Sequence, residues 1–184
     1  MAGGSCNSMK EVVMAAVKKI MVIGAGLMGG GIAQVGAQSG YGVILNDTAA
    51  EFVDKGYDSI SKLLDGQVKK EKITAADKGA VMGRIRKSIR LEDAKDVDFV
   101  IEAVYENLDV KKAIFQQLDG ICREDVIFAS NTSSIPITTL SAATKRPDRF
   151  IGMHFFSPVP VMRLVEIIRG PKTSEETMKV TEEI

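Results

Sequence analysis

The chain has 184 residues, which is enough for one full domain and too few for two of ordinary size. Its hydrophobic fraction of 45% and charged fraction of 26% are typical of a globular protein. The 24 basic side chains balance 24 acidic ones, so charge gives no reason to expect nucleic acid or an acidic membrane surface as a partner.

The N-terminal residues 1–17 contain only a short apolar patch, Val12–Val17, with Glu11 beside it. The patch is shorter than the core of a usual signal peptide and has no cleavage-like site, so we interpret residues 1–17 as a leader or an added extension. No stretch approaches the ~20 apolar residues that a membrane span needs. The two cysteines, Cys6 and Cys122, are too few for a disulfide framework and favour reduced thiols in a cytoplasmic protein.

A strand, a glycine-rich turn, a helix and a second strand follow one another at the start of the chain. Residues 19–23 form a short apolar run that stops at Gly24, which is typical of a buried parallel strand. Residues 27–39 have apolar positions near helical spacing, and residues 43–45 form a second buried strand. This order predicts a βαβ unit with parallel strands and a right-handed crossover.

The alternation of strands and helices continues along the chain. The segment 51–87 predicts two helices, the first lysine-rich over 51–72 and the second opening at Thr74 with a capping-box pattern that ends in Asp77. Further strands are expected at 88–91, 99–104, 126–129, 150–156 and 164–168, and further helices at 108–118 and after Pro136. The pattern predicts an α/β fold of the Rossmann type, a doubly wound sheet over residues 18–172.

The last residues, 173–184, open a short helix. Thr173-Ser174-Glu175-Glu176 is a helix N-terminal signature whose acidic residues the helix dipole favours. A helix this short gains little stability unless it packs on something. We therefore interpret residues 173–184 as the start of a linker to a second domain that this sequence does not include.

A dinucleotide-binding fingerprint, G-x-G-x-x-G, lies between the first strand and the first helix, in the context that the motif requires. Gly24 permits the tight turn, Gly26 lets the backbone approach a pyrophosphate, and Gly29 allows close packing of helix on sheet. Asp47, at the end of the second strand, is placed to bind the adenosine ribose hydroxyls, and its charge favours NAD over NADP. The alternative is that these are only turn and packing glycines beside a solvated Asp47. The residues expected to hold the cofactor are Gly24, Ala25, Gly26, Leu27, Met28, Gly29 and Asp47.

The single histidine, His154, lies in an apolar strand pattern, where a lone histidine is more often a satisfied core residue than a catalyst. Glu166 lies inside the following apolar strand, where an unpaired carboxylate is costly. A tight turn between these strands places Glu166 beside His154, which satisfies the carboxylate and fixes the imidazole tautomer. The polar run 130–134 follows the strand 126–129 and is expected to face the ligand crevice, with an ordinary helix N-cap as the alternative.

Together these motifs resemble those of the L-3-hydroxyacyl-CoA dehydrogenases, with the bacterial 3-hydroxybutyryl-CoA dehydrogenases nearest. The resemblance rests on the glycine motif, on Asn131-Thr132-Ser133-Ser134, and above all on Met153–Met162 followed by Leu164-Val165-Glu166, and it covers residues 18–184. It implies a reversible, NAD-linked oxidation of an (S)-3-hydroxyacyl-CoA, such as 3-hydroxybutyryl-CoA, to the 3-ketoacyl-CoA in fatty acid or butyrate metabolism.

The resemblance also implies roles for single residues. His154 becomes the general base for the substrate hydroxyl, with Glu166 as its orienting partner. Ser133 becomes a hydrogen-bond partner of the reacting oxygen near the nicotinamide, and Asn131 a substrate contact. Ser157 stands where the family usually has an asparagine that contacts the nicotinamide and the substrate, so positioning is expected to be looser here.

Two further groups of residues match the family less specifically. Glu106 and Lys111 match positions that contact the cofactor, with a solvated helix start as the alternative. The lysine-rich helix lies where the family meets the CoA phosphates, with Ser61 and Lys69 as the candidate contacts and an ordinary charged helix face as the alternative. No metal is needed, because one histidine and two distant cysteines cannot build a zinc site.

The usual C-terminal all-helical domain of the family is absent from the sequence. In the family it supplies an active-site asparagine, one wall of the acyl cleft and most of a homodimer interface, so the full-length form is expected to be a homodimer. The 184 residues alone are expected to bind NAD(H), to turn over weakly and to expose an apolar patch.

Two alternative functions remain open from the sequence. One is an NAD-dependent dehydrogenase of a 3-hydroxy acid that is not linked to CoA, which normally uses a lysine base and lacks the His-Phe-Phe-x-Pro segment. The other is a non-catalytic NAD-binding protein that resembles the crystallin relatives of the family.

Overall fold

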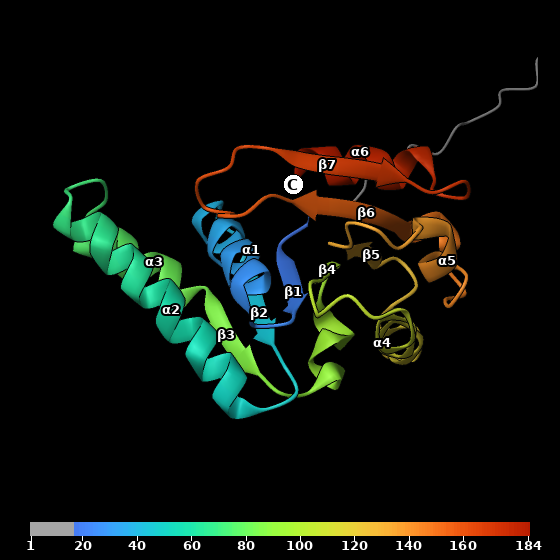
Figure 1. The fold of residues 1–184 in the computed structure, drawn as a ribbon, viewed down its shortest axis with the longest axis horizontal. Helices are drawn as coiled ribbons and strands as arrows, with labels where there is room; N and C mark the ends of the chain where they lie inside the picture. The colour runs from blue at the N-terminus through green and yellow to red at the C-terminus, as the bar shows by residue number, and fades with distance from the viewer. Residues whose placement is uncertain (1–16) are drawn as a thin grey trace, which may run out of the picture.

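One sheet of seven strands organises the computed structural model, which describes residues 17–184 (Figure 1). The strands run in the order β3-β2-β1-β4-β5-β6-β7; the first six are parallel, and β7 pairs antiparallel with β6. Their bounds are β1 (Lys19–Ile23), β2 (Gly42–Asn46), β3 (Ile85–Ser88), β4 (Phe99–Glu102), β5 (Ile127–Ser130), β6 (Phe150–Phe155) and β7 (Val165–Arg169). The predicted doubly wound α/β sheet is therefore confirmed, while Cys6 and all of the predicted leader except Val17 lie outside the described residues.

Helices cover both faces of the sheet and close a separate hydrophobic core on each. One core joins the sheet to α1 (Leu27–Gln38), α2 (Ala50–Lys69), α3 (Ala75–Gly83) and α6 (Glu175–Glu183). The other joins it to the 3₁₀ helix η1 (Leu91–Asp96), α4 (Leu108–Ile121) and α5 (Ile137–Ser141). A second 3₁₀ turn, η2 (Pro147–Arg149), precedes β6. Apart from one terminal residue each (Lys19, Glu102 and Ser130), the strands β1, β4 and β5 are apolar, because both of their faces are covered.

The predicted helix at the end of the chain is present and packed. Ser174 caps α6 by accepting a hydrogen bond from the backbone N–H of Thr177, and Glu175 and Glu176 occupy its first turn. The helix buries Val180 and Thr181 beside β6 and β7, in agreement with Figure 1, where α6 lies against β7. The capping box at Thr74 and Asp77 that opens α3 is also confirmed by both of its hydrogen bonds.

The expected strand at 88–91 is wrong, because the third strand is β3 (Ile85–Ser88) and the chain then turns into η1. Ile85 and Ser88 are buried at the two ends of β3, whereas Ile89 is exposed. The Ser88 hydroxyl accepts a hydrogen bond from the N–H of Arg90 and donates one to Asp93, and these local bonds end the strand. The expected strand therefore lies three residues too late along the chain.

The cysteine within the described residues, Cys122, is a buried free thiol at the end of α4. Burial raises the pKa of this thiol to about 11, which keeps it protonated and unreactive. Among the described residues no helix is long and apolar enough to span a bilayer.

Candidate active site

The glycine motif forms the turn between β1 and α1, and its three glycines face three different constraints. Gly24 has a φ of +101°, and a Cβ placed there would lie 2.6 Å from the carbonyl oxygen of Ala103. A Cβ on Gly29 would lie 1.7 Å from the carbonyl oxygen of Gly24, so α1 can approach the turn only without a side chain. Around Gly26 no atom lies within 4 Å of a Cβ position, which leaves its backbone open to a ligand.

Asp47 follows β2 and points back at the glycine turn. Its Oδ2 accepts a hydrogen bond from the N–H of Ala25 at 2.8 Å, and its Oδ1 accepts one from the N–H of Thr48 at 2.7 Å. A pocket of about 440 Å³ opens beside it, lined also by Gly24, Asn46 and Ile89. The open face of Gly26 and the carboxylate beside this pocket fit the pyrophosphate and adenosine ribose of a dinucleotide.

Two further glycines, Gly30 and Gly31, extend the motif into α1, and only Gly31 serves close packing. A Cβ on Gly31 would lie 2.8 Å from Cβ of Val159, so this glycine lets the β6–β7 connection lie directly on α1. Around Gly30 no atom comes closer than 4.0 Å to a Cβ position. Leu27, within the motif and at the start of α1, is 79% exposed, and Val161 in the β6–β7 connection is also exposed, which gives this face an apolar rim.

His154 and Glu166 are cross-strand neighbours. They are register partners in the antiparallel pair β6–β7, and His154 Nδ1 lies 2.8 Å from Glu166 Oε2. Because a carboxylate can only accept, Nδ1 carries the proton of this bond and Nε2 is left with its lone pair. The expected pairing is therefore present, although the connection runs over residues 156–164 and is not the tight turn that was expected.

A cleft of about 370 Å³ opens next to this pair at the carboxyl ends of the strands. Its lining residues are Met28, Ala103, Val104, Glu106, Asn131, Ser133, His154, Phe155, Phe156 and Ser157. Five of the predicted site residues, Met28, Glu106, Asn131, Ser133 and Ser157, thus meet His154 around one cavity. The side chains of His154 and Glu166 are 22% and 54% exposed, so this cleft is open to water.

Asn131 has a structural bond that the sequence did not reveal. Its Oδ1 accepts a hydrogen bond from the N–H of Phe155 at 2.8 Å, which ties the loop after β5 to the end of β6. The neighbouring Ser133 is exposed. It lines the same cleft as His154, which fits a contact with a reacting oxygen, and this role remains a prediction.

Lys111 does not belong to the solvated helix start that the alternative interpretation described, whereas Glu106 is partly exposed and is paired. Lys111 is 1% exposed, and its Nζ contacts Glu102 Oε1 at 2.6 Å and Glu106 Oε2 at 3.2 Å. Glu106 Oε1 accepts hydrogen bonds from the hydroxyls of Thr132 and Ser134. Glu106 borders the cleft, whereas the Lys111 ammonium lies behind it, so a direct contact of Lys111 with the cofactor remains a prediction.

We expect the Glu106 carboxyl to make the fold more stable above its ordinary titration range. Burial alone would raise its pKa, but the Thr132 hydrogen bond and the Lys111 charge lower the pKa from 4.5 to about 2. Because the folded-state pKa is the lower one, this stabilisation is complete above pH 4.5 and is lost as the pH falls toward 2. Urea unfolding of the wild type and of Glu106→Gln should show a difference in the free energy of unfolding that shrinks over this range. A difference that does not vary with pH would contradict the assignment.

The candidate CoA contacts lie apart from the cleft lining. Ser61 and Lys69 are on α2, and α2 contributes no residue to the lining of the cleft. Figure 1 shows α2 and α3 together as a hairpin at one end of the sheet. The structure therefore brings the reaction and cofactor residues together but leaves Ser61 and Lys69 as predictions.

Sequence reasoning missed two residues next to the site. Glu102 is a fully buried carboxylate at the end of the apolar strand β4, the same signal that drew attention to Glu166. Gly56 on α2 lies against the glycine motif, because its Cβ would be 2.5 Å from the carbonyl oxygen of Ala25. No local pattern marks Gly56, since it lies inside a helix about 30 residues from the turn that it contacts.

Comparison with known proteins gives consistent matches along the described chain. The family model for the NAD-binding domain of 3-hydroxyacyl-CoA dehydrogenase matches residues 19–184. A probable 3-hydroxybutyryl-CoA dehydrogenase of Deinococcus radiodurans is 52% identical over 90% of this chain and 59% of its own length. A fatty acid oxidation complex subunit alpha of Psychrobacter cryohalolentis is 47% identical over 90% of this chain and 23% of its own length.

A solved structure shows the same fold. The (S)-3-hydroxybutyryl-CoA dehydrogenase of Ralstonia eutropha superimposes with a TM-score of 0.90 and 50% identity, over 91% of this chain and 59% of that protein. The chain thus spans less than two thirds of the length of these relatives.

Proposed function

This chain belongs to the 3-hydroxyacyl-CoA dehydrogenase family, as its NAD-binding domain. From that membership and the cleft geometry, we propose that it takes part in the reversible oxidation of an (S)-3-hydroxyacyl-CoA to the 3-ketoacyl-CoA. The proposed substrate is 3-hydroxybutyryl-CoA, in fatty acid or butyrate metabolism, and the proposed location is the cytoplasm. The observation that carries the proposal is the His154–Glu166 pair at a cleft that begins at the glycine motif.

Three residues of the chain have distinct roles in the proposed reaction. His154 Nε2 accepts the proton of the substrate hydroxyl during oxidation and returns it during reduction. Glu166 holds the imidazole through Nδ1 and balances the positive charge that forms on the ring. Ser133 hydrogen-bonds the same substrate oxygen from the cleft wall. NAD supplies the acceptor for the hydride that leaves C3 of the substrate.

The cofactor site of the chain suits this proposal. Gly26 gives the pyrophosphate access to backbone N–H groups at the start of α1, where the helix dipole favours an anion. Asp47 accepts hydrogen bonds from the adenosine ribose at the pocket on one side of the turn, while the His154 cleft lies on the other. A 2′-phosphate would meet the Asp47 charge, which accounts for NAD as the cofactor.

The proposal that the substrate is a CoA thioester is tested by comparing acetoacetyl-CoA with free acetoacetate. We expect the 184-residue chain to oxidise NADH with acetoacetyl-CoA faster than with acetoacetate, at a low absolute rate because its cleft is open to water. Loss of NADH absorbance gives the rates, and calorimetry in the presence of NAD gives the affinities for the two compounds. Equal or better binding and turnover of acetoacetate would instead support a dehydrogenase of free 3-hydroxy acids. Binding of NADH with neither thioester binding nor turnover would favour a non-catalytic protein.

A further inference from the structure

Glu102 is a buried carboxylate that no step of the proposed reaction uses. It is the last residue of β4 and is 0% exposed. Both oxygens of its carboxylate have hydrogen-bond or ion-pair partners. Burial of a carboxylate is costly unless it is paired, so these partners show which parts of the chain Glu102 holds together.

The Glu102 carboxylate joins the ends of two neighbouring strands. Its Oε2 accepts a hydrogen bond from the hydroxyl of Ser130 at 2.6 Å, and Ser130 is its register partner at the end of β5. Its Oε1 accepts one from the backbone N–H of Val104 at 2.8 Å. The backbone N–H of Asn131 also donates to the Glu102 carbonyl oxygen at 2.8 Å. Glu102 therefore holds the start of the segment after β4, at Val104, and the start of the segment after β5, at Asn131.

Lys111 links the Glu102 carboxylate to Glu106, which borders the cleft. Its ammonium contacts Glu102 Oε1, Glu106 Oε2 and, at 3.3 Å, the carbonyl oxygen of Val104. Glu106 in turn accepts hydrogen bonds from Thr132 and Ser134, the residues on either side of Ser133. A continuous set of charged contacts thus runs from Glu102, behind the cleft, to the wall that carries Ser133.

We propose that Glu102 is a positioning residue, which fixes segments 103–106 and 131–134 as the two walls of the cleft next to His154. Residues of both segments line that cleft, and Glu102 lies behind them at the strand ends. Loops at strand ends hold a ligand only if something fixes them, and a buried, fully paired network does so without touching the ligand. The proposal rests on the proposed function in one respect, that the cleft receives the nicotinamide end of the cofactor.

The test uses two ligands that occupy different parts of the cofactor site. NADH reaches from the Asp47 pocket to the His154 cleft, whereas AMP fits only the adenosine end. Calorimetric titration of Glu102→Gln should show NADH affinity reduced about tenfold, because the walls that meet the nicotinamide end are no longer held in place. The affinity for AMP should stay within about twofold of the wild-type value.

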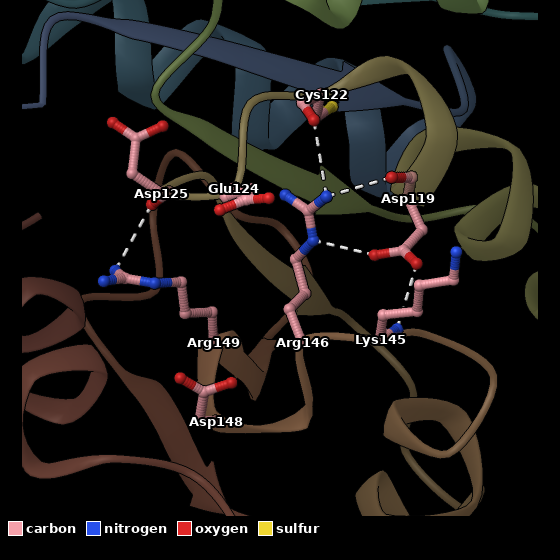
Figure 2. Close-up of a pocket in the computed structure, with 8 residues that line it drawn as sticks. All are labelled: Asp119, Cys122, Glu124, Asp125, Lys145, Arg146, Asp148 and Arg149. Carbon is pink, nitrogen blue, oxygen red and sulfur yellow. Dashed lines mark hydrogen bonds and ion pairs between the residues drawn. The ribbon is translucent and has the colours of Figure 1, made fainter.

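A matched control lies at the other end of α4. Asp119 and Arg146 form a comparable ion pair at 2.8 Å, with side chains 8% and 10% exposed, near the chain segments that lead into β5 and β6 (Figure 2). Figure 2 shows the Arg146 guanidinium turned toward Asp119 and toward the end of α4 at Cys122. Asp119→Asn should lower the stability of the chain in a similar way and leave the affinities for NADH and AMP unchanged.

Urea unfolding curves recorded at several temperatures identify one at which both variants are folded. If Glu102→Gln does not fold, Ser130→Ala removes one hydrogen bond from Glu102 and keeps the ion pair, and it should show a smaller loss of the same selectivity for NADH. Unchanged NADH affinity in the folded variant, equal loss of NADH and AMP, or the same selective loss in Asp119→Asn would each overturn the proposal. None of these results depends on whether acetoacetyl-CoA reacts, so they are separate from a failure of the proposed substrate.

Discussion

Replacement of His154 by glutamine is expected to reduce NADH-dependent reduction of acetoacetyl-CoA by about 10²- to 10⁴-fold, the usual contribution of a general acid–base group. Glutamine keeps a polar side chain near Glu166 but cannot accept and return a proton at the position of Nε2. The affinity for NADH should stay close to that of the wild type, because the glycine turn and Asp47 are on other strands. Steady-state rates and NADH fluorescence titrations measure the two quantities separately.

Glu166→Gln provides the matched comparison for that variant. The amide retains the shape of the carboxylate and can still accept from Nδ1, but it carries no charge to balance a protonated imidazole. Its rate should therefore fall less than that of His154→Gln. A His154→Gln chain that retains most of its turnover would exclude His154 as the proton acceptor, and a loss of NADH binding in that variant would point to a structural role.

Gly56→Ala and Gly66→Ala are expected to change the stability of the chain in opposite directions, although both glycines lie in α2. A Cβ on Gly56 would lie 2.5 Å from the carbonyl oxygen of Ala25, whereas no atom lies within 4 Å of a Cβ on Gly66. Alanine at Gly66 should therefore raise the free energy of unfolding by up to about 1 kcal/mol, the gain in helix propensity. Alanine at Gly56 obtains the same gain but incurs overpacking of about 1–3 kcal/mol against backbone, so its net effect is a loss.

Gly56→Ala should also weaken NADH binding, because the backbone that must move belongs to the glycine turn. A loss of about tenfold, equivalent to ~1.4 kcal/mol, is expected for Gly56→Ala and none for Gly66→Ala. Urea unfolding and NADH titration of the two variants measure these effects. Equal behaviour of the two variants in both measurements would show that the contact between α2 and the turn does not constrain the site.

The cofactor end of the site could be predicted from sequence because its geometry is local. Gly24, Gly26 and Gly29 lie in one six-residue motif, and the constraint on Gly29 comes from the carbonyl oxygen of Gly24 in that motif. The doubly wound sheet could be predicted in the same way, since parallel strands joined by helices have few allowed arrangements. The boundary error at β3 had a local cause too, because hydrogen bonds of Ser88 outweighed the apolar side chain of Ile89.

The sequence by itself determined which chemical groups the chain has: a dinucleotide turn, one histidine, and a carboxylate in the next strand that needs a partner. Only the tertiary structure decided which groups meet. Glu166 meets His154 because β7 runs antiparallel to β6 in one particular register. Glu102 meets Lys111 because α4 packs beside the ends of β4 and β5, and Gly56 meets Ala25 because α2 crosses the glycine turn. Such contacts depend on packing between segments distant in sequence, and neither periodicity nor local propensity determines them.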